Sequence, residues 1–479
     1  MDASSSSPAP LRPGPAGTDS GTPILPPLRP ASGGLRFKLR TTGVEPVFRL
    51  LACLAGIVLR ELGGRVGDLL AAPDERATRR TERQRRAAQS VATTLGRLKG
   101  AFVKLGQFAA LRYDLLPAWA REGLASLHDR AAPLPFESVL QVVETELARP
   151  LGEAFLAFAP EPLGTASIAQ VHRARLASGQ DVAVKVQHPW LEGCLGADLA
   201  LLRGLLGVWT LVTGRGREAS RRLFDEFAAA LREELDFERE AAVAHEIASN
   251  LCLEPQIVVP EIVPALTTRR VLTMSFHAAV SITDRSGLAR LGVAPAAVLE
   301  ILARAYAKQV FVDGLFHADP HPGNLFVLDE PGAALRPRVL FIDFGLSRRL
   351  DPGLRRELRQ ALFALLQRDL EGFVGAMDRM GMIAPGAQDG VRVAVQAMLE
   401  RMQREGGSPL ALSGGQVLSL KDEAKRLLQQ TPGIQLPNDL LLYARTLSYL
   451  FALGAELDPS VDLLKISLPY LLRFLGGKD

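Results

Sequence analysis

Hydrophobic and polar residues follow one another along this chain in two ways, one typical of helices and one typical of strands. Residues 45–130 and about 198–250 have the patterning of helices. Between them, residues 161–189 contain short β-branched runs separated by ASGQ, which predicts a strand, a turn and a second strand. Two more strand-like runs, IVVPEIV and RRVLTMSF, end near residue 276. The rest of the chain is mainly helical apart from one hairpin, so the pattern predicts an α+β protein.

The hairpin is contained in the sequence FHADPHPGNLFVLDEPGAALRPRVLFIDFG. Its two apolar runs, 325–328 and 339–342, are separated by DEPGAALRPR, in which Pro and Gly mark a turn. If the runs pair antiparallel, Asn324 and Asp343 meet at one end of the pair, and Asp319 lies five residues before Asn324. Carboxylate and amide oxygens in one place suit a hard cation such as Mg²⁺. The alternative is that these are the Asp and Asn residues common at hairpin ends.

The order of these residues matches that of a protein-kinase site. Asp319, Asn324 and the DFG sequence at 343–345 follow the order of the catalytic-loop aspartate, its asparagine and the metal-binding aspartate. Upstream, the valines of DVAVKV alternate with Lys185, which therefore lies on the opposite face of the predicted strand. A single VAVK is a weak signal. Together with the downstream residues it favours a lysine that holds nucleotide phosphates over an ordinary surface lysine.

The composition limits the class of protein and its partners. Of the 479 residues, 47% are hydrophobic and 23% are charged, as in a soluble protein long enough for two or three domains. The net formal charge of +4 is small and gives no support to nucleic-acid binding. Cys53, Cys194 and Cys252 are isolated, which suits a reducing compartment and argues against a disulfide framework or a zinc knuckle. We expect a cytoplasmic protein, with peripheral membrane contact left open.

Several stretches bear on targeting and on membranes. Residues 1–34 are rich in Ser, Pro and Gly and lack the apolar run of a signal peptide, so we predict a disordered tail. No run reaches the roughly 18–20 apolar residues of a transmembrane helix, and the nearest, 50–59 and 199–212, are expected to be core or surface-docking helices. Six arginines in residues 76–86 predict a solvated helix face or a patch for anionic lipid or nucleic acid.

Taken together, the motifs resemble those of the UbiB/ADCK group of atypical kinase-like proteins, also called aarF-domain kinases. FVKLGQFAALRYDLLP (102–117) is similar to the KxGQ motif of that group, and LGTASIAQVH (163–172) to its alanine-rich nucleotide loop. EELDFEREA (233–241) is similar to its ExD segment, and LPNDLLLYARTLSYLFALGAELDP to its closing helices. The resemblance extends from about residue 90 to 460, and the set of motifs in this order is specific.

The resemblance implies a bilobal protein-kinase-like α+β fold with a helical N-terminal KxGQ extension packed over the active-site cleft. It implies a helical extension over residues 35–149, after the tail at 1–34. An N-lobe is expected over residues 150–276. A helical C-lobe with the catalytic loop and DFG is expected over residues 277–479.

The resemblance also implies a site for ATP or ADP with Mg²⁺. The expected catalytic residues are Asp319 as base and Lys185 paired with Glu240. The residues expected to bind the nucleotide are Lys185, Gly164, Thr165, Ala166, Ser167 and Met274. Those expected to hold Mg²⁺ are Asn324 and Asp343. Regulatory contacts are expected to involve Lys104 and Gln107 of the extension with Glu234 and Asp236. His317 takes the place of the HRD histidine and is expected to be packed and hydrogen-bonded, because a zinc site with His321 lacks further ligands nearby.

Departures from ordinary protein kinases point away from a protein substrate. Gly164 is the single glycine of the phosphate loop, and Ala318 replaces the HRD arginine that anchors a phosphorylated loop. A helix is predicted soon after Gly345, leaving no activation segment. We therefore expect a Mg²⁺–ATP-binding ATPase or small-molecule kinase, linked by the resemblance to isoprenoid-quinone or lipid metabolism. The alternatives are a protein kinase and a nucleotide-binding pseudokinase scaffold without turnover.

The candidate partners follow from the same features. Besides the nucleotide, they are an anionic membrane surface or proteins of a lipid pathway. The C-terminal sequence LLKISLPYLLRFLGGKD is either a last core helix or an amphipathic helix against a membrane or partner. Nucleic acid is not an expected partner, because no aromatic residues accompany the arginines of 76–86. The sequence leaves the oligomeric state open.

Overall fold

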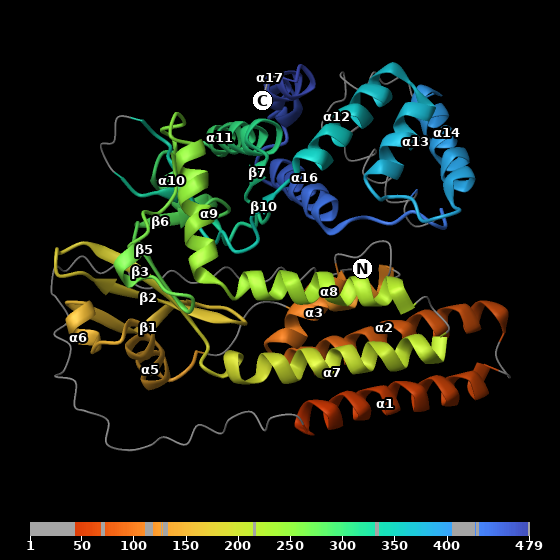
Figure 1. Cartoon of the computed structure of the whole chain (residues 1–479), viewed down its shortest axis with the longest axis horizontal. Helices are drawn as coiled ribbons and strands as arrows, with labels where there is room; N and C mark the ends of the chain where they lie inside the picture. The colour runs from red at the N-terminus through yellow and green to blue at the C-terminus, as the bar shows by residue number, and fades with distance from the viewer. Residues whose placement is uncertain are drawn as a thin grey trace, which may run out of the picture. The chain divides into compact units, whose positions relative to one another are not determined.

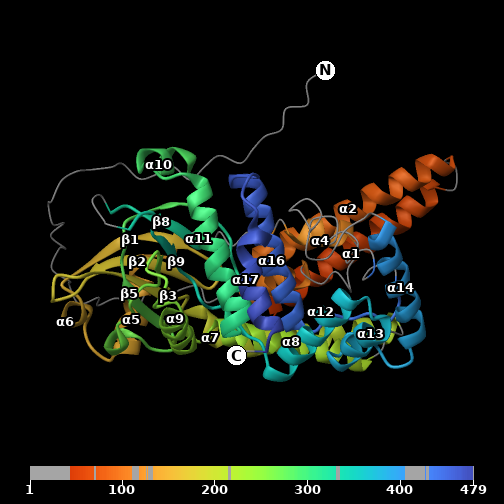
Figure 2. The same ribbon diagram turned by 90° about the horizontal axis from the view of Figure 1, so that it is seen from above.

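The computed structural model describes residues 44–68, 72–110, 118–125, 127, 133–213, 217–330, 335–404, 427 and 431–477. They all lie within one compact unit, residues 37–479 (Figures 1 and 2). The predicted tail at 1–34 and the second half of the KxGQ stretch, from 111 to 117, lie outside the described residues.

The first sheet carries the predicted nucleotide loop and Lys185. Its strand order is β1-β2-β3-β5, and all three pairings are antiparallel. The strands are β1 (Ala157–Thr165), β2 (Ala169–Arg175), β3 (Asp181–Gln187) and β5 (Val271–Ser275). In β3 the three valines are buried and Lys185 lies on the opposite face, where its side chain is mostly buried, so the predicted alternation is confirmed.

The second sheet contains the predicted hairpin. Its order is β4-β9-β8-β6, with β4 (Ile257–Val258), β6 (Ala279–Ser281), β8 (Leu325–Leu328) and β9 (Val339–Phe341). β8 and β9 pair antiparallel with Leu325 opposite Phe341, which confirms the hairpin and places its polar ends together. Two further strands, β7 (Leu315–Phe316) and β10 (Arg348–Arg349), pair with each other on either side of the catalytic loop and DFG. At two residues each, they are too short to show in the sequence pattern.

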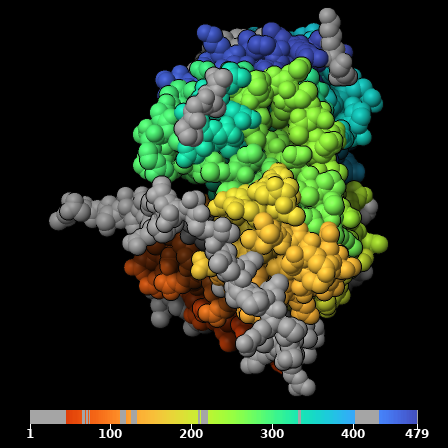
Figure 3. All heavy atoms as spheres, turned by 90° about the vertical axis from the view of Figure 1, so that its left-hand side faces the viewer, coloured from red at the N-terminus to blue at the C-terminus, as the bar shows by residue number. Residues whose placement is uncertain are grey.

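The helices of the first half of the chain lie either against the first sheet, as α5 and α9 do, or to one side of it (Figure 1). They are α1 (Val44–Asp68), α2 (Pro73–Leu98), α3 (Ala101–Ala110), α4 (Ala118–Ala125), α5 (Phe136–Leu147), α6 (Leu151–Ala154), α7 (Trp190–Thr213), α8 (Arg217–Glu234) and α9 (Phe237–Asn250). One apolar cluster joins α2, α3, α7 and α8 to β5 through residues such as Phe102, Leu199, Phe227 and Leu272. In the space-filling view the yellow residues of the first sheet adjoin the green residues of α9 and later elements (Figure 3).

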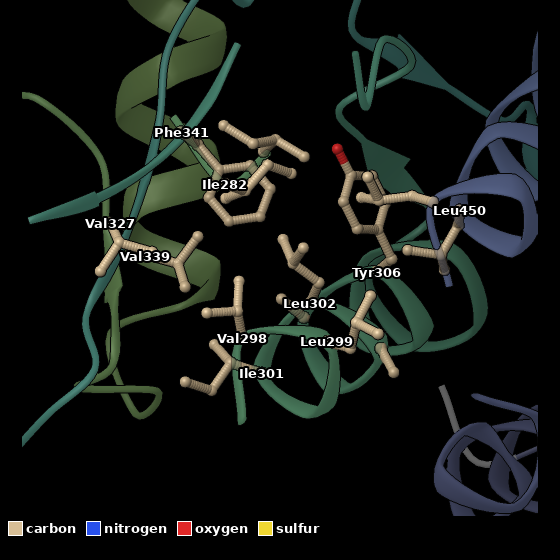
Figure 4. Packing of buried hydrophobic residues seen from close by; sticks show 14 of the residues in the cluster. Ile282, Val298, Leu299, Ile301, Leu302, Tyr306, Val327, Val339, Phe341 and Leu450 are labelled. Atoms are coloured by element: carbon tan, nitrogen blue, oxygen red, sulfur yellow. The ribbon is translucent and has the colours of Figure 1, made fainter. Parts of the chain in front are cut away.

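The second half of the chain is mainly helical. Its elements are η1 (Pro264–Leu266), α10 (Arg285–Arg290), α11 (Pro295–Ala307), a π-helical segment η2 (Lys308–Asp313), α12 (Pro352–Gln367), α13 (Leu370–Arg379), α14 (Gln388–Arg404), α16 (Asn438–Leu457) and α17 (Leu463–Leu475). Strand residues Val327, Val339 and Phe341 face Leu302 of α11 across the largest apolar cluster, and Leu450 of α16 closes it (Figure 4). This cluster holds the hairpin that carries the predicted metal ligands.

The start of α12 limits the space that follows DFG. Asp351 caps α12, accepting the backbone N–H groups of Gly353 and Leu354, and Pro352 occupies the first helical position. Only five residues lie between Gly345 and Asp351, and two of them belong to β10. The expected absence of a long segment between DFG and the next helix is confirmed.

Two C-terminal helices bear on membrane contact. Among the described residues, α16 is the one helix long and apolar enough to cross a membrane, contrary to the prediction that no run reaches that length. Its leucines at 440–442, 450, 453 and 457 are buried, so packing explains its composition. In α17, Leu463, Phe474 and Leu475 are buried, which favours a last core helix for this part of the chain.

Candidate active site

Three segments distant in sequence bring charged side chains to one point. Lys185 lies on β3, Glu240 on α9, and Asp343 directly after the hairpin. The Lys185 Nζ donates to Glu240 Oε1 at 2.9 Å and Oε2 at 3.0 Å, and to Asp343 Oδ1 at 3.1 Å. Glu240 is 2% exposed and Lys185 12%, whereas half of the Asp343 side chain is accessible. The contact between Lys185 and Glu240 that the resemblance implied is therefore present, with the Glu240 carboxylate in the interior and the Asp343 carboxylate accessible to solvent.

These charges determine one another's protonation. Burial would lower the pKa of Lys185, but the carboxylates of Asp343 and Glu240 outweigh it and raise that pKa above its ordinary value. Burial raises the pKa of Glu240 to about 7, against the opposing effect of Lys185. Burial would also raise the pKa of Asp343, but the charge and hydrogen bond of Lys185 hold it at about 2. At neutral pH the site therefore contains an ionised lysine, Lys185, and an ionised aspartate, Asp343.

The loop before β8 holds Asp319 and Asn324 in contact. The Asn324 Nδ2 donates to the Asp319 carboxylate (Oδ2) at 3.0 Å and to the Asp319 carbonyl at 3.2 Å. The Ile342 N–H donates to the Asn324 carbonyl, which ties the loop to the strand before Asp343. Because the Asn324 amide nitrogen is used within the loop, its side-chain oxygen is the atom left to face a cation.

His317 fixes the backbone at the start of DFG. Its side chain is fully buried, with Nδ1 3.1 Å from the hydroxyl of Tyr306, which is visible at the edge of the core cluster (Figure 4). Its Nε2 lies 3.0 Å from the Ile342 carbonyl and 2.9 Å from the Asp343 carbonyl, close enough to donate to both. Asp343 has a φ of 62°, a left-handed conformation that costs a non-glycine residue energy. The expectation of a packed, hydrogen-bonded histidine is confirmed, and its bonds hold Asp343 in this conformation.

Sequence reasoning missed Arg445, which lies on α16. Its Nη2 donates to Asp319 Oδ1 at 2.9 Å, and both side chains are 19% exposed. The guanidinium also lies over the ring of Tyr449, 5.2 Å from its centroid. The next residue, Thr446, donates its hydroxyl to the Ala318 carbonyl at 3.2 Å. Helix α16 thus holds the catalytic loop at two successive residues.

One signal in the sequence could have drawn attention to Arg445. Within α16 it is the one charged residue between Asp439 and Glu456. A single charge in an otherwise apolar helix is costly to bury unless a partner of opposite charge is present. The identity of that partner could not be read from the sequence.

The residues expected to cover the nucleotide, Gly164 to Ser167, lie where β1 turns into β2 in the first sheet. Gly164 and Thr165 end β1, and the Ala166 N–H donates to the Ala169 carbonyl at 2.8 Å to close the turn into β2. A β-carbon at Gly164 would meet open space, so the backbone there is open to a ligand. Ser167 is buried in the turn, and Met274 lies on β5 opposite Ala183. The structure therefore brings the loop and Met274 to the same sheet as Lys185.

His188, which belongs to none of the motifs, forms a hydrogen bond to the backbone of this loop. The Nε2 of His188 donates to the Ala166 carbonyl at 3.0 Å. Its ring stacks on Trp190, with 5.9 Å between ring centroids and 19° between planes. Trp190 in turn covers Gly100, where a β-carbon would lie 2.7 Å from a ring atom. The nucleotide loop is thus linked through two rings to the turn that begins α3.

The expected regulatory residues do not all meet. Lys104 of α3 forms an ion pair with Glu234 at the end of α8. Asp236 accepts a backbone N–H of the first turn of α9 as its N-cap. The Gln107 amide donates to the Leu127 carbonyl at 3.3 Å. Of the two acidic candidates, Glu234 is the one that contacts Lys104, and Gln107 bonds to the backbone two residues after the end of α4.

The residues present fit Mg²⁺ bound together with a nucleotide. Within the described residues, no three His, Cys, Asp or Glu side chains are grouped to hold a metal by themselves. Mg²⁺ commonly uses only one or two protein oxygens and completes its shell with phosphate and water. The Asp343 carboxylate and the Asn324 side-chain oxygen match that requirement, and Lys185 beside them offers a charge for phosphate. The expectation against zinc is consistent with His317, whose nitrogens already have partners.

Comparison with known proteins assigns the chain to a family. Residues 126–377, more than half of the chain, match the ABC1 atypical kinase-like domain. The chain belongs to the ABC1 atypical kinase-like family. The resemblance stated from the motifs is therefore confirmed, and so is the mixed α+β kinase-like fold.

Several ABC1-family relatives are similar over most of this chain. The probable protein kinase UbiB of Marinobacter nauticus is 32% identical over 79% of this chain and 68% of its own length. The chloroplastic protein Activity of BC1 Complex Kinase 8 of Arabidopsis thaliana is 32% identical over 80% of this chain. This chain matches about half of that protein, 53% of its length. Rv3197 of Mycobacterium tuberculosis, solved in complex with erythromycin, superimposes with a TM-score of 0.55 at 25% identity, covering 84% of this chain and 100% of that one.

Proposed function

We propose that this ABC1-family protein binds ATP with Mg²⁺ and transfers its terminal phosphoryl group to water or to a small molecule. The observation that carries the proposal is Lys185, held 2.9 Å from Glu240 and 3.1 Å from Asp343. In kinases this arrangement places a lysine on the nucleotide phosphates and an aspartate on the metal. Bound Mg²⁺ would neutralise charge that develops on the phosphates, with Asp343 and Asn324 as its protein ligands.

Phosphoryl transfer requires positioning and charge stabilisation more than covalent chemistry. Lys185 supplies a fixed positive charge, because its partners keep it ionised. Asp319 is the candidate base, and its carboxylate is oriented by Asn324 on one oxygen and Arg445 on the other. An acceptor hydroxyl or water would therefore meet a carboxylate whose position is fixed before it binds.

Three features favour a small acceptor over a protein. The short connection from Gly345 to α12 leaves no extended platform for a peptide. Ala318 removes the cation that would anchor a phosphorylated loop. The ion pair of Lys104 with Glu234 supports our proposal that the N-terminal KxGQ helices lie over the cleft, where a peptide would otherwise bind. The link to isoprenoid-quinone or lipid metabolism rests on the resemblance to the UbiB/ADCK group.

The test is hydrolysis of ATP by the purified chain with Mg²⁺, alongside nucleotide binding by calorimetry. Asp343→Asn and Lys185→Ala are expected to abolish turnover. Asp329→Asn, an exposed aspartate at the far end of the same hairpin, is the matched control and should leave turnover unchanged. Binding without turnover under every condition would assign the chain to the pseudokinase alternative. Turnover that survives Asp343→Asn would overturn the proposed site.

A further inference from the structure

The short strand that follows DFG carries two arginines whose side chains contact α8 and α9. β10 consists of Arg348 and Arg349. The Arg348 Nη1 donates to Glu233 Oε2 at the end of α8, and the Arg349 Nη2 donates to Glu246 Oε1 of α9. The paired residues are 115 and 103 positions apart in the sequence. Both residues of β10 therefore link the segment after DFG to helices from the first half of the chain.

These contacts hold α9 on either side of Glu240. Glu233 also forms an ion pair at 3.4 Å with Arg239 of α9, the residue directly before Glu240, so Glu233 bridges the first turn of α9 to β10. Glu246 lies six residues after Glu240, less than two helical turns further along. Glu240 itself contacts DFG, because its carboxylate accepts the backbone N–H of Phe344. Helix α9 is thus tied to DFG and to the strand after it at three places.

The backbone of β10 is fixed to the strand that leads into the catalytic loop. β10 pairs antiparallel with β7, with Arg348 opposite Phe316 and Arg349 opposite Leu315. Phe316 is fully buried and directly precedes His317 of the catalytic loop. Movement of α9 away from the site therefore has to break the ion pairs of the two arginines or displace a buried strand.

In protein kinases a phosphorylated residue after DFG often has this task, because its phosphate binds arginines and fixes the helix that carries the glutamate. Here the segment LSRRL between Gly345 and Asp351 contains a single hydroxyl, that of Ser347. Ser347 is 1% exposed, so it is not accessible to a modifying enzyme in the folded chain. The segment instead carries arginines, and the helices that it contacts carry the acidic partners.

We propose that Arg348 and Arg349 are positioning residues that hold α9, and with it Glu240, in place without phosphorylation of the chain. Glu240 in turn keeps Lys185 where the nucleotide phosphates would lie, and phosphoryl transfer requires this lysine–glutamate pair to be in place. The two arginines thereby keep the site assembled without an external signal. The inference deepens the proposed function and rests on it, because positioning of Glu240 matters for turnover only if the site binds nucleotide.

The test measures two quantities for each variant: kcat/KM for ATP with Mg²⁺, and hydrogen exchange of α9, residues 237–250. Arg349→Glu puts two carboxylates together, so kcat/KM should fall by about threefold to tenfold, and α9 should exchange faster. Adding Glu246→Arg restores opposite charges and should return both quantities to within about twofold of the wild type. The midpoint of urea unfolding should change little in either variant, because these side chains are 55% and 43% exposed. A rescue at constant stability distinguishes positioning from a general contribution to folding.

Arg348→Met tests the more buried pair. Methionine keeps an apolar stem of similar length and removes the charge, so kcat/KM should fall by about tenfold or more as Glu233 loses a charged hydrogen bond. Arg392→Glu is the matched control, because Arg392 of α14 is also 55% exposed and pairs with Glu371 of α13. This control should change neither kcat/KM nor the exchange of α9.

Several outcomes would overturn the proposal. One is α9 that exchanges at the wild-type rate in both Arg349→Glu and Arg348→Met, and another is faster exchange with unchanged kcat/KM. Treatment of the wild type with a broad-specificity phosphatase should leave kcat/KM unchanged, and a loss of turnover would contradict assembly without phosphorylation.

Failure of the proposed function is distinguishable from failure of this inference. A wild type without turnover would contradict the proposed phosphoryl transfer, whereas exchange of α9 would still report whether the arginines hold the helix. The affinity for ATP, measured by calorimetry, would then replace kcat/KM. Its weakening in Arg349→Glu and its recovery on adding Glu246→Arg would support the positioning role, and an unchanged affinity would contradict it.

Discussion

The guanidinium of Arg445 lies 2.9 Å from the carboxylate of Asp319, although 126 residues separate them. The other carboxylate oxygen of Asp319 accepts a hydrogen bond from Asn324 at 3.0 Å. A side chain from a late helix therefore completes the fixation of a loop near the middle of the chain. Since Ala318 has replaced the arginine of the HRD motif, the positive charge next to the candidate base comes from outside the loop.

We predict that Arg445→Ala lowers turnover of ATP more than it weakens nucleotide binding. The reason is that Asp319 loses one of its two orienting contacts, whereas Lys185 and Asp343 keep theirs. Loss of one such contact is expected to reduce kcat by about tenfold to a hundredfold. Steady-state kinetics and calorimetry on the same preparation distinguish the two effects. The control is Arg285→Ala, which removes a hydrogen bond from Arg285 to the Glu456 carbonyl at the far end of α16. This variant should change neither kcat nor the affinity for nucleotide.

A second prediction concerns the buried charges of Lys185 and Glu240. Lys185→Met should lower the free energy of unfolding by about 3 kcal/mol, because it leaves the Glu240 carboxylate, 2% exposed, without a cation. Lys185→Met with Glu240→Met should recover most of that loss, since no charge then remains buried there. Urea unfolding in mildly alkaline buffer measures both. Neither variant should hydrolyse ATP, so a double variant that is stable and inactive separates the role of the pair in catalysis from its role in folding.

Reversing the charges of Lys104 and Glu234 tests how α3 is held. Lys104→Glu puts two carboxylates together, so we expect faster hydrogen exchange in α3, residues 101–110. Adding Glu234→Lys restores opposite charges and should bring the exchange rate back toward that of the wild type. If α3 of the Lys104→Glu variant exchanged as slowly as that of the wild type, the ion pair would not be what holds α3 in place. Lys99→Glu, on an exposed residue just before α3, provides the control for added negative charge.

The buried histidines of the first sheet predict a loss of stability in acid. Burial lowers the pKa of His188 and of His172 below the ordinary value of 6.5. As pH falls below that value, the unfolded chain binds protons that the folded chain does not, so the free energy of unfolding decreases. Each histidine can contribute a slope of at most about 1.4 kcal/mol per pH unit.

His188→Gln should reduce this slope, because glutamine can still donate to the Ala166 carbonyl but does not titrate. Urea unfolding over a series of pH values below neutrality provides the measurement. His245→Gln, on an exposed residue of α9, should leave the slope at its wild-type value. A slope unchanged in His188→Gln would mean that His188 takes up its proton in the folded state as readily as in the unfolded one.

The parts of the fold that sequence predicted are those set by local patterns. The alternation of DVAVKV placed Lys185 on one face of its strand, and the two apolar runs around DEPGAALRPR gave the hairpin. The contact of Arg445 with Asp319 could not be predicted, because it depends on where α16 packs. Charge alone could not predict whether Lys104 pairs with Glu234 or with Asp236. The preference of aspartate for helix N-caps could have separated them, since Asp236 caps α9.

The contact of Gly100 with Trp190 has a consequence for how these positions can vary. A β-carbon at residue 100 would lie 2.7 Å from the indole, and its φ of 52° disfavours most side chains. A side chain at residue 100 therefore requires a smaller residue at position 190, and it also requires a backbone conformation that residues other than glycine rarely adopt. Since the indole also stacks on the histidine behind the nucleotide loop, a smaller residue 190 would loosen that loop. We therefore expect relatives of this chain that have tryptophan at position 190 to keep glycine at position 100.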